Sequence, residues 1–276
     1  MIPLPLLFLI SIIAGGVGAI TGMGGGVILI PALTLWGVGI KHAIALSIIS
    51  MLAISNSAAS GYVKHHMPNL RVSSFLEVFA VIGAVIGSFG VLRFPPRILS
   101  IGCGAALLIF SGVLLRRRVA ASSAMVPQDH FSRALCWHGS YYDTAECRTI
   151  SYQGRHAALA GPLMCVAAIM SGLLGMGGSA LVVLMNDLII GLPQKVALTT
   201  SNLVIGVMAL TSADLCLEGG LIEARLVGPV ILGVAFGSFL GARTVLKLTN
   251  RTTRTIFAYV LVVLGVELLV RGLQIW

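Results

Sequence analysis

Residues 21–33 read TGMGGGVILIPAL, and residues 173–185 read LLGMGGSALVVLM. The same Gly-Met-Gly-Gly tetrapeptide therefore occurs twice, 153 positions apart, each time at the start of an apolar run. Glycine is a poor helix former, so we expect each tetrapeptide to interrupt a helix. A repeated interruption of this kind predicts a chain built from two related halves.

The composition places the chain among membrane proteins. Its 276 residues are 57% hydrophobic and 10% charged, and the mean hydropathy is +1.01. Soluble domains are about 45–50% apolar and about 25% charged. Several apolar runs exceed the roughly 17–20 residues that a helix needs to cross a bilayer. The net charge of +9 does not indicate a nucleic-acid partner, because the Lys and Arg residues lie between apolar runs, as they do beside membrane spans.

The first apolar segment belongs to the mature protein in our interpretation. Residues 1–19 lack the basic start of a signal peptide and have a counterpart at 157–174, which also leads into Gly-Met-Gly-Gly. The five cysteines show no metal or redox spacing. His65-His66 is a weak metal candidate that we assign to an interfacial loop, so we expect neither a metal nor a cofactor.

Further matches between the halves support a duplication. Ala45-Leu46-Ser47 aligns with Ala197-Leu198-Thr199, and Gly83/Gly87 aligns with Gly233/Gly237, at offsets of 150–153. We predict a first transmembrane repeat over residues 1–116, a polar connecting loop over 117–156 and a second transmembrane repeat over 157–276. The apolar segments of the first repeat are 3–20, 27–40, 42–62, 72–93 and 97–116, and those of the second are 157–174, 179–192, 195–214, 226–247 and 253–273.

The second segment of each half is short for a span, which leaves two topologies. If these segments do not cross the bilayer, each half has four spans and the repeats are parallel; if they cross, each half has five and the repeats are inverted. Five spans place thirteen of the eighteen Lys and Arg residues on one side, whereas four spans divide them ten to eight. Basic residues concentrate on the cytoplasmic side. We therefore predict an all-α polytopic membrane protein of two inverted repeats, each with a broken or half-length second segment, with a cytoplasmic central loop.

The glycine runs are candidate anion sites. An interrupted helix at membrane depth must be buried in protein or line a wet cavity. The helix that follows exposes N–H groups and the positive end of its dipole, which bind anions. The alternative is close helix packing, which we prefer for Gly83/Gly87 and Gly233/Gly237. The candidate substrate-binding residues of the runs are Gly22, Gly24, Gly25 and Gly26 in the first half, and Gly175, Gly177, Gly178 and Ser179 in the second.

The third segments add hydroxyls and amides that can donate hydrogen bonds to an oxyanion. The alternatives are hydrogen bonds between helices or to the same helix. These candidate substrate-binding residues are Ser47, Ser50, Asn56, Thr199, Thr200, Ser201 and Asn202.

Ionisable residues within apolar segments are candidates for coupling. Asp187 is the candidate for proton coupling. Lys41 and Lys195 are candidates for drawing anions into a vestibule, or they extend to the membrane surface. No nucleophile with a base and no metal-ligand set lies within a predicted span, so we do not expect an enzyme.

The two halves, opening with ITGMGGGVILIPAL and LLGMGGSALVVLM and followed by a helix bearing Ser, Thr and Asn, resemble the sulfite exporter TauE/SafE family of membrane transporters. The resemblance covers nearly the whole chain except 117–156. It implies a protein of the bacterial inner membrane that moves a small sulfur-containing anion, such as sulfite, sulfoacetate or another organosulfonate. Ser179 stands where the first half has Gly26 and Leu184 where it has Pro31, which leaves the substrate open.

A secondary transporter of this kind would rock its repeats around a central site. Its expected partners are the anion, a coupling proton or Na⁺, the lipid bilayer and a second copy in a homodimer. The other functions we consider are a scaffold or partner subunit without transport, and a passive anion channel.

Overall fold

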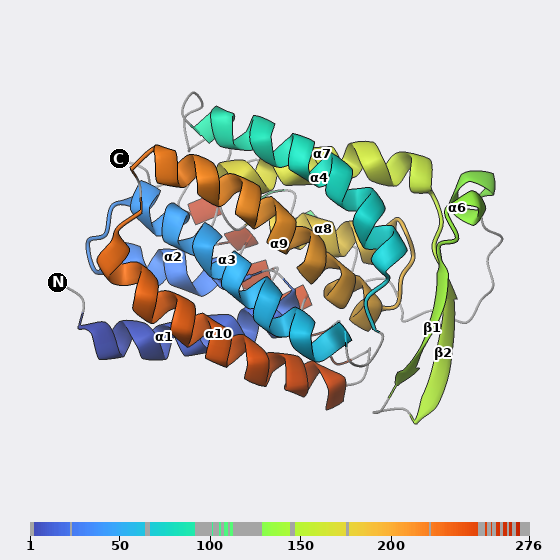
Figure 1. Ribbon diagram of the computed structural model, residues 1–276, viewed down its shortest axis with the longest axis horizontal. Helices are drawn as coiled ribbons and strands as arrows, with labels where there is room; N and C mark the ends of the chain where they lie inside the picture. Colours follow the sequence, from blue (N-terminus) through green and yellow to red (C-terminus); the bar gives the residue numbers. More distant parts are fainter. Residues whose placement is uncertain are drawn as a thin grey trace.

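The chain folds into a bundle of helices with one small β-sheet at one end (Figure 1). The computed structural model describes residues 3–22, 24–63, 67–91, 129–143, 147–174, 177–220 and 222–247, with scattered residues of 101–112 and 252–270. The elements are α1 (Leu4–Thr21), α2 (Gly26–Leu35), α3 (Ile40–Val63), α4 (Leu70–Val91), α6 (His130–Ala134), β1 (His138–Asp143), β2 (Arg148–Gln153), α7 (Ala157–Leu174), α8 (Gly177–Leu188), α9 (Gln194–Glu218) and α10 (Ala224–Lys247).

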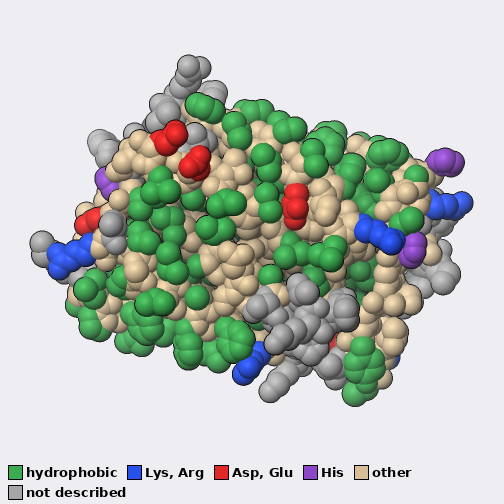
Figure 2. All heavy atoms as spheres, viewed as in Figure 1, with side chains coloured by type: hydrophobic (Ala, Val, Ile, Leu, Met, Phe, Trp, Pro, Cys, Tyr) green, Lys and Arg blue, Asp and Glu red, His purple; other side chains and the backbone are tan. Residues whose placement is uncertain are grey.

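Five of these helices are long and apolar enough to cross a membrane, namely α1, α3, α4, α9 and α10. Their outer faces carry large apolar side chains, as in α4, where Val78, Ile82 and Ile86 recur every fourth residue and are 61%, 51% and 51% exposed. Figure 2 shows hydrophobic side chains over the middle of the molecule and most Lys, Arg and His side chains toward the two ends of its long axis. Lipid is the solvent that suits such a surface, so the predicted all-α polytopic membrane fold is confirmed.

The first glycine run reverses the chain between α1 and α2. Gly22 ends α1 with φ +69°, and its N–H donates to the Gly18 carbonyl at 2.8 Å. Gly24 has φ +75°, a left-handed conformation that favours glycine. The chain then packs back on α1, because a Cβ on Gly18 would lie 2.7 Å from the Gly24 carbonyl carbon. With only ten residues, α2 is the half-length second segment that the sequence predicts.

The second half contains an equivalent helical pair. The Arg155 N–H, just before α7, donates to the carbonyl of Ile190, just after α8, at 3.0 Å. The pair α7–α8 therefore starts and finishes at one end of the molecule. The pair α1–α2 does the same at its own end, where Leu4 and Trp36 line one pocket.

The helices of the two halves begin at opposite ends. His42 at the start of α3 shares the pocket with Leu4 at the start of α1. By contrast, α7 and α9 begin beside the β-sheet at the far end (Figure 1). The packing also exchanges elements between halves: α1 packs against α10 and α4 against α7, while α3 and α9 pack against each other.

Close glycine contacts hold these exchanged pairs together. A Cβ on Gly87 of α4 would collide with the Ile169 carbonyl of α7, and one on Gly237 of α10 would collide with the Ile12 carbonyl of α1. Backbone approach of this kind is what small residues permit in membrane helices. The packing role predicted for these glycine pairs is confirmed.

The structure describes part of the predicted connecting loop. Residues 129–143 and 147–156 contain α6 and the antiparallel strands β1 and β2, and we call this unit the cap. Trp137 is fully buried, and its ring packs edge-on against Phe75 of α4 at 5.3 Å. The cap thus adds a two-stranded sheet to an otherwise helical fold.

The predicted fifth segments, 97–116 and 253–273, lie largely outside the described residues. Those of their residues that the structure describes are helical. The two segments meet where the Ser111 hydroxyl donates to the Ala258 carbonyl at 3.0 Å.

Candidate functional site

The first glycine run lies where the two halves meet. A Cβ on Gly22 would come within 2.8 Å of Leu198 Cδ2 on α9 and 3.2 Å of Val183 Cγ2 on α8. One on Gly24 would come within 2.6 Å of Met51 Cγ on α3. These neighbours are apolar, and close packing accounts for glycine at both positions. Gly25 is equally confined, and Gly26 is the first residue of α2.

The second glycine run is described in part. Gly175 lies outside the described residues, whereas Gly177 and Gly178 form the first turn of α8. Ser179, next along α8, is fully buried.

The polar residues of the first half do not form a group of free donors. Ser47 and Ser50 are fully buried, and the Ser50 hydroxyl donates to the Ser47 carbonyl of its own helix at 2.7 Å. Asn56 lies on an exposed face of α3, apart from them. The Ser50 hydroxyl is therefore bonded within its own helix, which was one of the alternatives to substrate binding.

The polar residues of the second half are buried together with an amide of α8. Asn186 Nδ2 donates to the Ser201 hydroxyl at 2.8 Å, and both residues have no exposed surface. Asn202 is 1% exposed, and its backbone carbonyl accepts from the Ser55 hydroxyl of α3 at 2.5 Å. Helices α3, α8 and α9 therefore converge on this polar region.

Two neighbouring threonines have structural partners. The Thr199 hydroxyl donates to the Lys195 carbonyl of α9 at 2.9 Å. The Thr200 hydroxyl accepts from the Asn69 N–H at 3.0 Å, and Asn69 Oδ1 accepts from the Val72 N–H at the start of α4 at 3.2 Å. Thr200 thus joins α9, through Asn69, to the first turn of α4.

Three buried amides have polar atoms without a hydrogen-bond partner among the described residues. They are Asn186 Oδ1, Gln194 Oε1 and Nε2, and Asn202 Nδ2. We call Asn186, Gln194 and Asn202 the amide cluster. A buried polar atom left unpaired costs about 1–3 kcal/mol, so such atoms usually mark water or a ligand.

The amide cluster offers neutral donors near one face of α9. Gln194 and Ser201 are seven residues apart, which places them on the same face of a helix. The Ser201 oxygen accepts from Asn186, so its own proton remains to donate. The Ser201 hydroxyl and Asn202 Nδ2 are therefore two donors that suit the oxygens of an anion, whereas Gln194 Nε2 lies about 10 Å away along the helix axis, at the start of α9.

Lys195 is buried and paired with the cap. Its ammonium lies 2.8 Å from Asp143 Oδ1 at the end of β1, and both side chains are 0% exposed. The Tyr141 hydroxyl lies 3.4 Å from the other carboxylate oxygen. Lys195 therefore does not extend to the membrane surface. Lys41 is in the first turn of α3, and Asp187 is partly buried on α8.

A second polar contact ties the cap to the bundle. Asn69 Nδ2 donates to the Tyr152 hydroxyl of β2 at 3.3 Å. Burial raises the pKa of the Tyr152 phenol, and the hydrogen bond from Asn69 partly opposes this rise. The cap thus reaches both α4, through Asn69, and α9, through Lys195.

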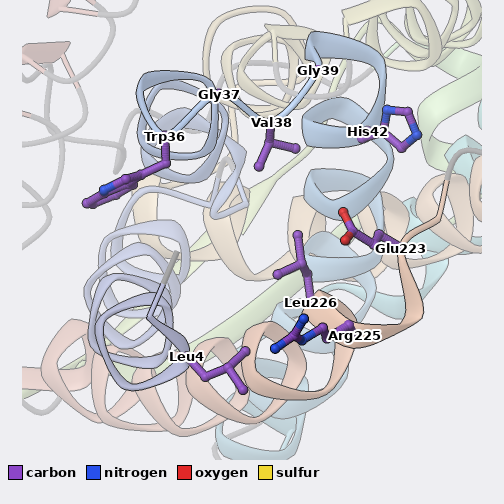
Figure 3. A pocket seen from close by; sticks show the side chains of 9 residues that line it. All are labelled: Leu4, Trp36, Gly37, Val38, Gly39, His42, Glu223, Arg225 and Leu226. Carbon is purple, nitrogen blue, oxygen red and sulfur yellow. The ribbon is translucent and has the colours of Figure 1, made fainter. Parts of the chain in front are cut away.

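The opposite end of the molecule holds a pocket of about 390 Å³. Figure 3 shows its lining from both halves: Leu4, Trp36, Gly37, Val38, Gly39 and His42, with Glu223, Arg225 and Leu226 at the start of α10. The offset of 152 that aligns Ser47 with Thr199 also aligns His42 with Gln194. This pocket is therefore the counterpart of the region that the cap covers.

Sequence reasoning did not select Asn186, Gln194 or Asp143. In the sequence these residues appear as a lone Asn in an apolar segment, a Gln at a helix start and an acid in a polar loop, and none of these patterns by itself indicates a binding site. Within the described part of the chain, no group of three His, Cys, Asp or Glu could hold a metal ion. His65 and His66 lie outside that part.

Comparison with known proteins gives two matches. The profile of the family described as "Sulfite exporter TauE/SafE" matches residues 7–268. The chain is 25% identical to the "Probable membrane transporter protein YunE" of Bacillus subtilis (strain 168), over 97% of this chain and 98% of that one. No solved structure matches the chain.

Proposed function

Because the chain belongs to the sulfite exporter TauE/SafE family, a family of membrane transporters and not of enzymes, we propose that it is a secondary transporter for a small sulfur-containing anion such as sulfite, sulfoacetate or another organosulfonate. We place it in the bacterial inner membrane, with the cap on the cytoplasmic side. The charge distribution along the sequence supports this orientation.

The observation that carries the proposal is the amide cluster. Its unpaired donor Asn202 Nδ2 is buried where α9 meets α3 and α8, and its other unpaired donor, Gln194 Nε2, is buried at the start of α9. Neutral donors bind a small anion without the cost of a permanently buried charge. Ser201 supplies a further proton, and Ser179 and the start of α8 lie on the neighbouring helix.

Alternating access is the mechanism that we propose. Helices α1 and α3 begin at one end and α7 and α9 at the other, which supports inverted repeats. Transporters with such repeats bind substrate between the halves, beside interrupted helices. The glycine turn between α1 and α2 lies at such a place, against Val183 and Leu198 of the second half. Asp187, one residue after Asn186, is the group that we propose for proton coupling.

The experiment is thermal unfolding of the purified protein with sulfite, thiosulfate, sulfoacetate, sulfate or chloride. A ligand at a hundred times its Kd stabilises a protein by about 2.7 kcal/mol, which corresponds to a rise in Tm of roughly 5–10 °C for a chain of this size. We expect a sulfur anion to produce that rise. Asn202→Leu should abolish it, because the amide donor is lost.

Thr211→Val is the matched control on the same helix, since the Thr211 hydroxyl donates to the Val207 carbonyl of its own helix at 3.1 Å. It should keep the anion response. If no sulfur anion stabilises the protein beyond chloride, a scaffold function or another substrate class is favoured. Uptake into proteoliposomes then separates a transporter, which shows saturation and counterflow, from a passive channel.

A further inference from the structure

Lys195, in the first turn of α9, already binds an anion, and that anion belongs to the chain itself. The Asp143 carboxylate of the cap accepts from Lys195 Nζ at 2.8 Å, with both side chains fully buried. A carboxylate resembles a small sulfur oxyanion in its negative charge and its oxygen acceptors. Asp143 therefore shows what this place can bind.

Three features make the start of α9 suitable for an anion. The Ala197 N–H donates to the Pro193 carbonyl at 2.8 Å, so the helix begins at Gln194 and its first N–H groups lack acceptors within the helix. The helix dipole adds positive potential there. The Gln194 amide, 4% exposed, has neither polar atom paired among the described residues.

We propose that Lys195 and Gln194 form an anion-binding site for the transported substrate, and that Asp143 is a tethered competitor that occupies this site when the cap is closed. The inference rests on the proposed function and adds to it a cationic contact for the substrate. An anion that takes the place of Asp143 releases the end of the cap, and Asp143 returns when the anion leaves.

Burial of the ion pair favours this exchange over simple opening of the cap. A buried ammonium that loses its ion-pair partner is unfavourable, so an anion that replaces the carboxylate favours release of the cap from Lys195. Asp143 is the last residue of β1, whereas Trp137 comes directly before the first residue of that strand. The ion pair therefore holds one end of the cap, while the packing of Trp137 on Phe75 holds the other.

The opposite end of the molecule shows the same region without a cover. His42, the counterpart of Gln194, lines the open pocket of about 390 Å³. Leu226, also in that pocket, is the counterpart of Leu76 at an offset of 150, and Leu76 belongs to the buried cluster that contains Trp137. In this proposal the two ends are the mouths of the transporter, and the cap closes the mouth at the start of α9.

The test combines anion affinity with hydrogen exchange in the full-length protein. Sulfite and thiosulfate are the probes, with chloride at equal ionic strength as the reference. We expect either probe to increase exchange in residues 138–143 and 147–153 of the wild type. Asp143→Asn should raise exchange there without any anion. It should also tighten binding by about 10- to 100-fold if the closed cap is populated at about 90–99% in the wild type.

A charge swap distinguishes a binding site from a purely structural ion pair. Asp143→Lys combined with Lys195→Asp keeps an ion pair but removes the cation from α9. We expect it to hold the cap closed and to lose sulfite and thiosulfate binding at least tenfold. Size-exclusion profiles identify a variant that has not folded, and Lys195→Gln, which should also lose affinity, then takes its place.

The inference is overturned if Asp143→Asn leaves affinity unchanged or weakens it, or if the swapped protein binds like the wild type. Transport of a sulfur anion by all variants with equal Km would reject the tethered competitor and leave the proposed function intact. Absence of binding and of flux in the wild type would reject both.

Discussion

The contact between α1 and α10 can be tested with two adjacent glycines. A Cβ on Gly15 would collide with the Val234 carbonyl and lie 2.7 Å from Val234 Cα, whereas one on Gly16 would meet only the Gly237 carbonyl oxygen, at an ordinary 3.5 Å. Carbon atoms pack at about 3.5–4.0 Å. Gly15→Ala must therefore push the helices apart by roughly 1 Å, while Gly16→Ala needs no movement.

The two variants should change stability in opposite directions. Alanine gains roughly 0.5–1 kcal/mol over glycine within a helix, so Gly16→Ala should raise Tm by about 1–4 °C. Overpacking costs about 1–3 kcal/mol, and separated helices also lose dispersion contacts along their length. Gly15→Ala should therefore lower Tm, by up to roughly 10 °C.

The measurement is thermal unfolding of both variants in the same detergent, with anion uptake by proteoliposomes as a second readout. Because α1 belongs to the first half and α10 to the second, the Gly15 variant should also slow uptake. A Tm for Gly15→Ala equal to or above that of Gly16→Ala would refute the close packing of these helices.

Two further predictions concern the cap and the glycine turn. Burial raises the pKa of Tyr152 above its ordinary value of 10.0, so the stability that the neutral phenol contributes should be complete below pH 10 and lost as the pH rises through the folded-state pKa. Tyr152→Phe should remove this alkaline loss of stability, which Tm measured from pH 8 to 11 would show. An equal alkaline loss in both proteins would contradict the assignment. Gly22 and Gly37 both have positive φ, but an added Cβ would lie 2.8 Å from Leu198 at Gly22 and would meet nothing within 4 Å at Gly37. Gly22→Ala should therefore lower Tm more than Gly37→Ala, which has only the left-handed strain of about 1–2 kcal/mol. Equal losses of Tm would show that Leu198 moves aside.

Much of the fold follows from patterns that are local in sequence. Long apolar runs became α1, α3, α4, α9 and α10, and the short second segments became α2 and α8. Glycine spacing predicted helix contacts, because a glycine lets another helix backbone approach closely whichever half of the chain that helix belongs to. The packing of α1 against α10 and of α4 against α7 could not be predicted from the sequence, since an apolar helix face does not specify which other apolar face it will contact.

The candidate site could be selected from the sequence only where polar residues interrupt an apolar helix. Thr199 through Asn202 stood out on that ground, but the sequence could not show which of them bond to their own helix and which face an unpaired amide. Asp143 was hidden for another reason: an acid in a polar loop ordinarily faces water. Its burial depends on Trp137 and Tyr152 folding the cap onto α4, a long-range event that no local pattern encodes.

The buried ion pair also bears on how such a transporter avoids a leak. A mouth closed only by apolar contacts would open whenever those contacts separate, with or without substrate. A mouth closed through Asp143 and Lys195 opens at lower cost when an anion is present to bind the lysine, because an ammonium that loses its partner in a buried place is unfavourable. A closed population of about 90–99%, as in the test above, leaves an empty, open mouth in only about 1–10% of molecules. Closure by a tethered carboxylate would thus make opening at this end depend on the charge of the cargo.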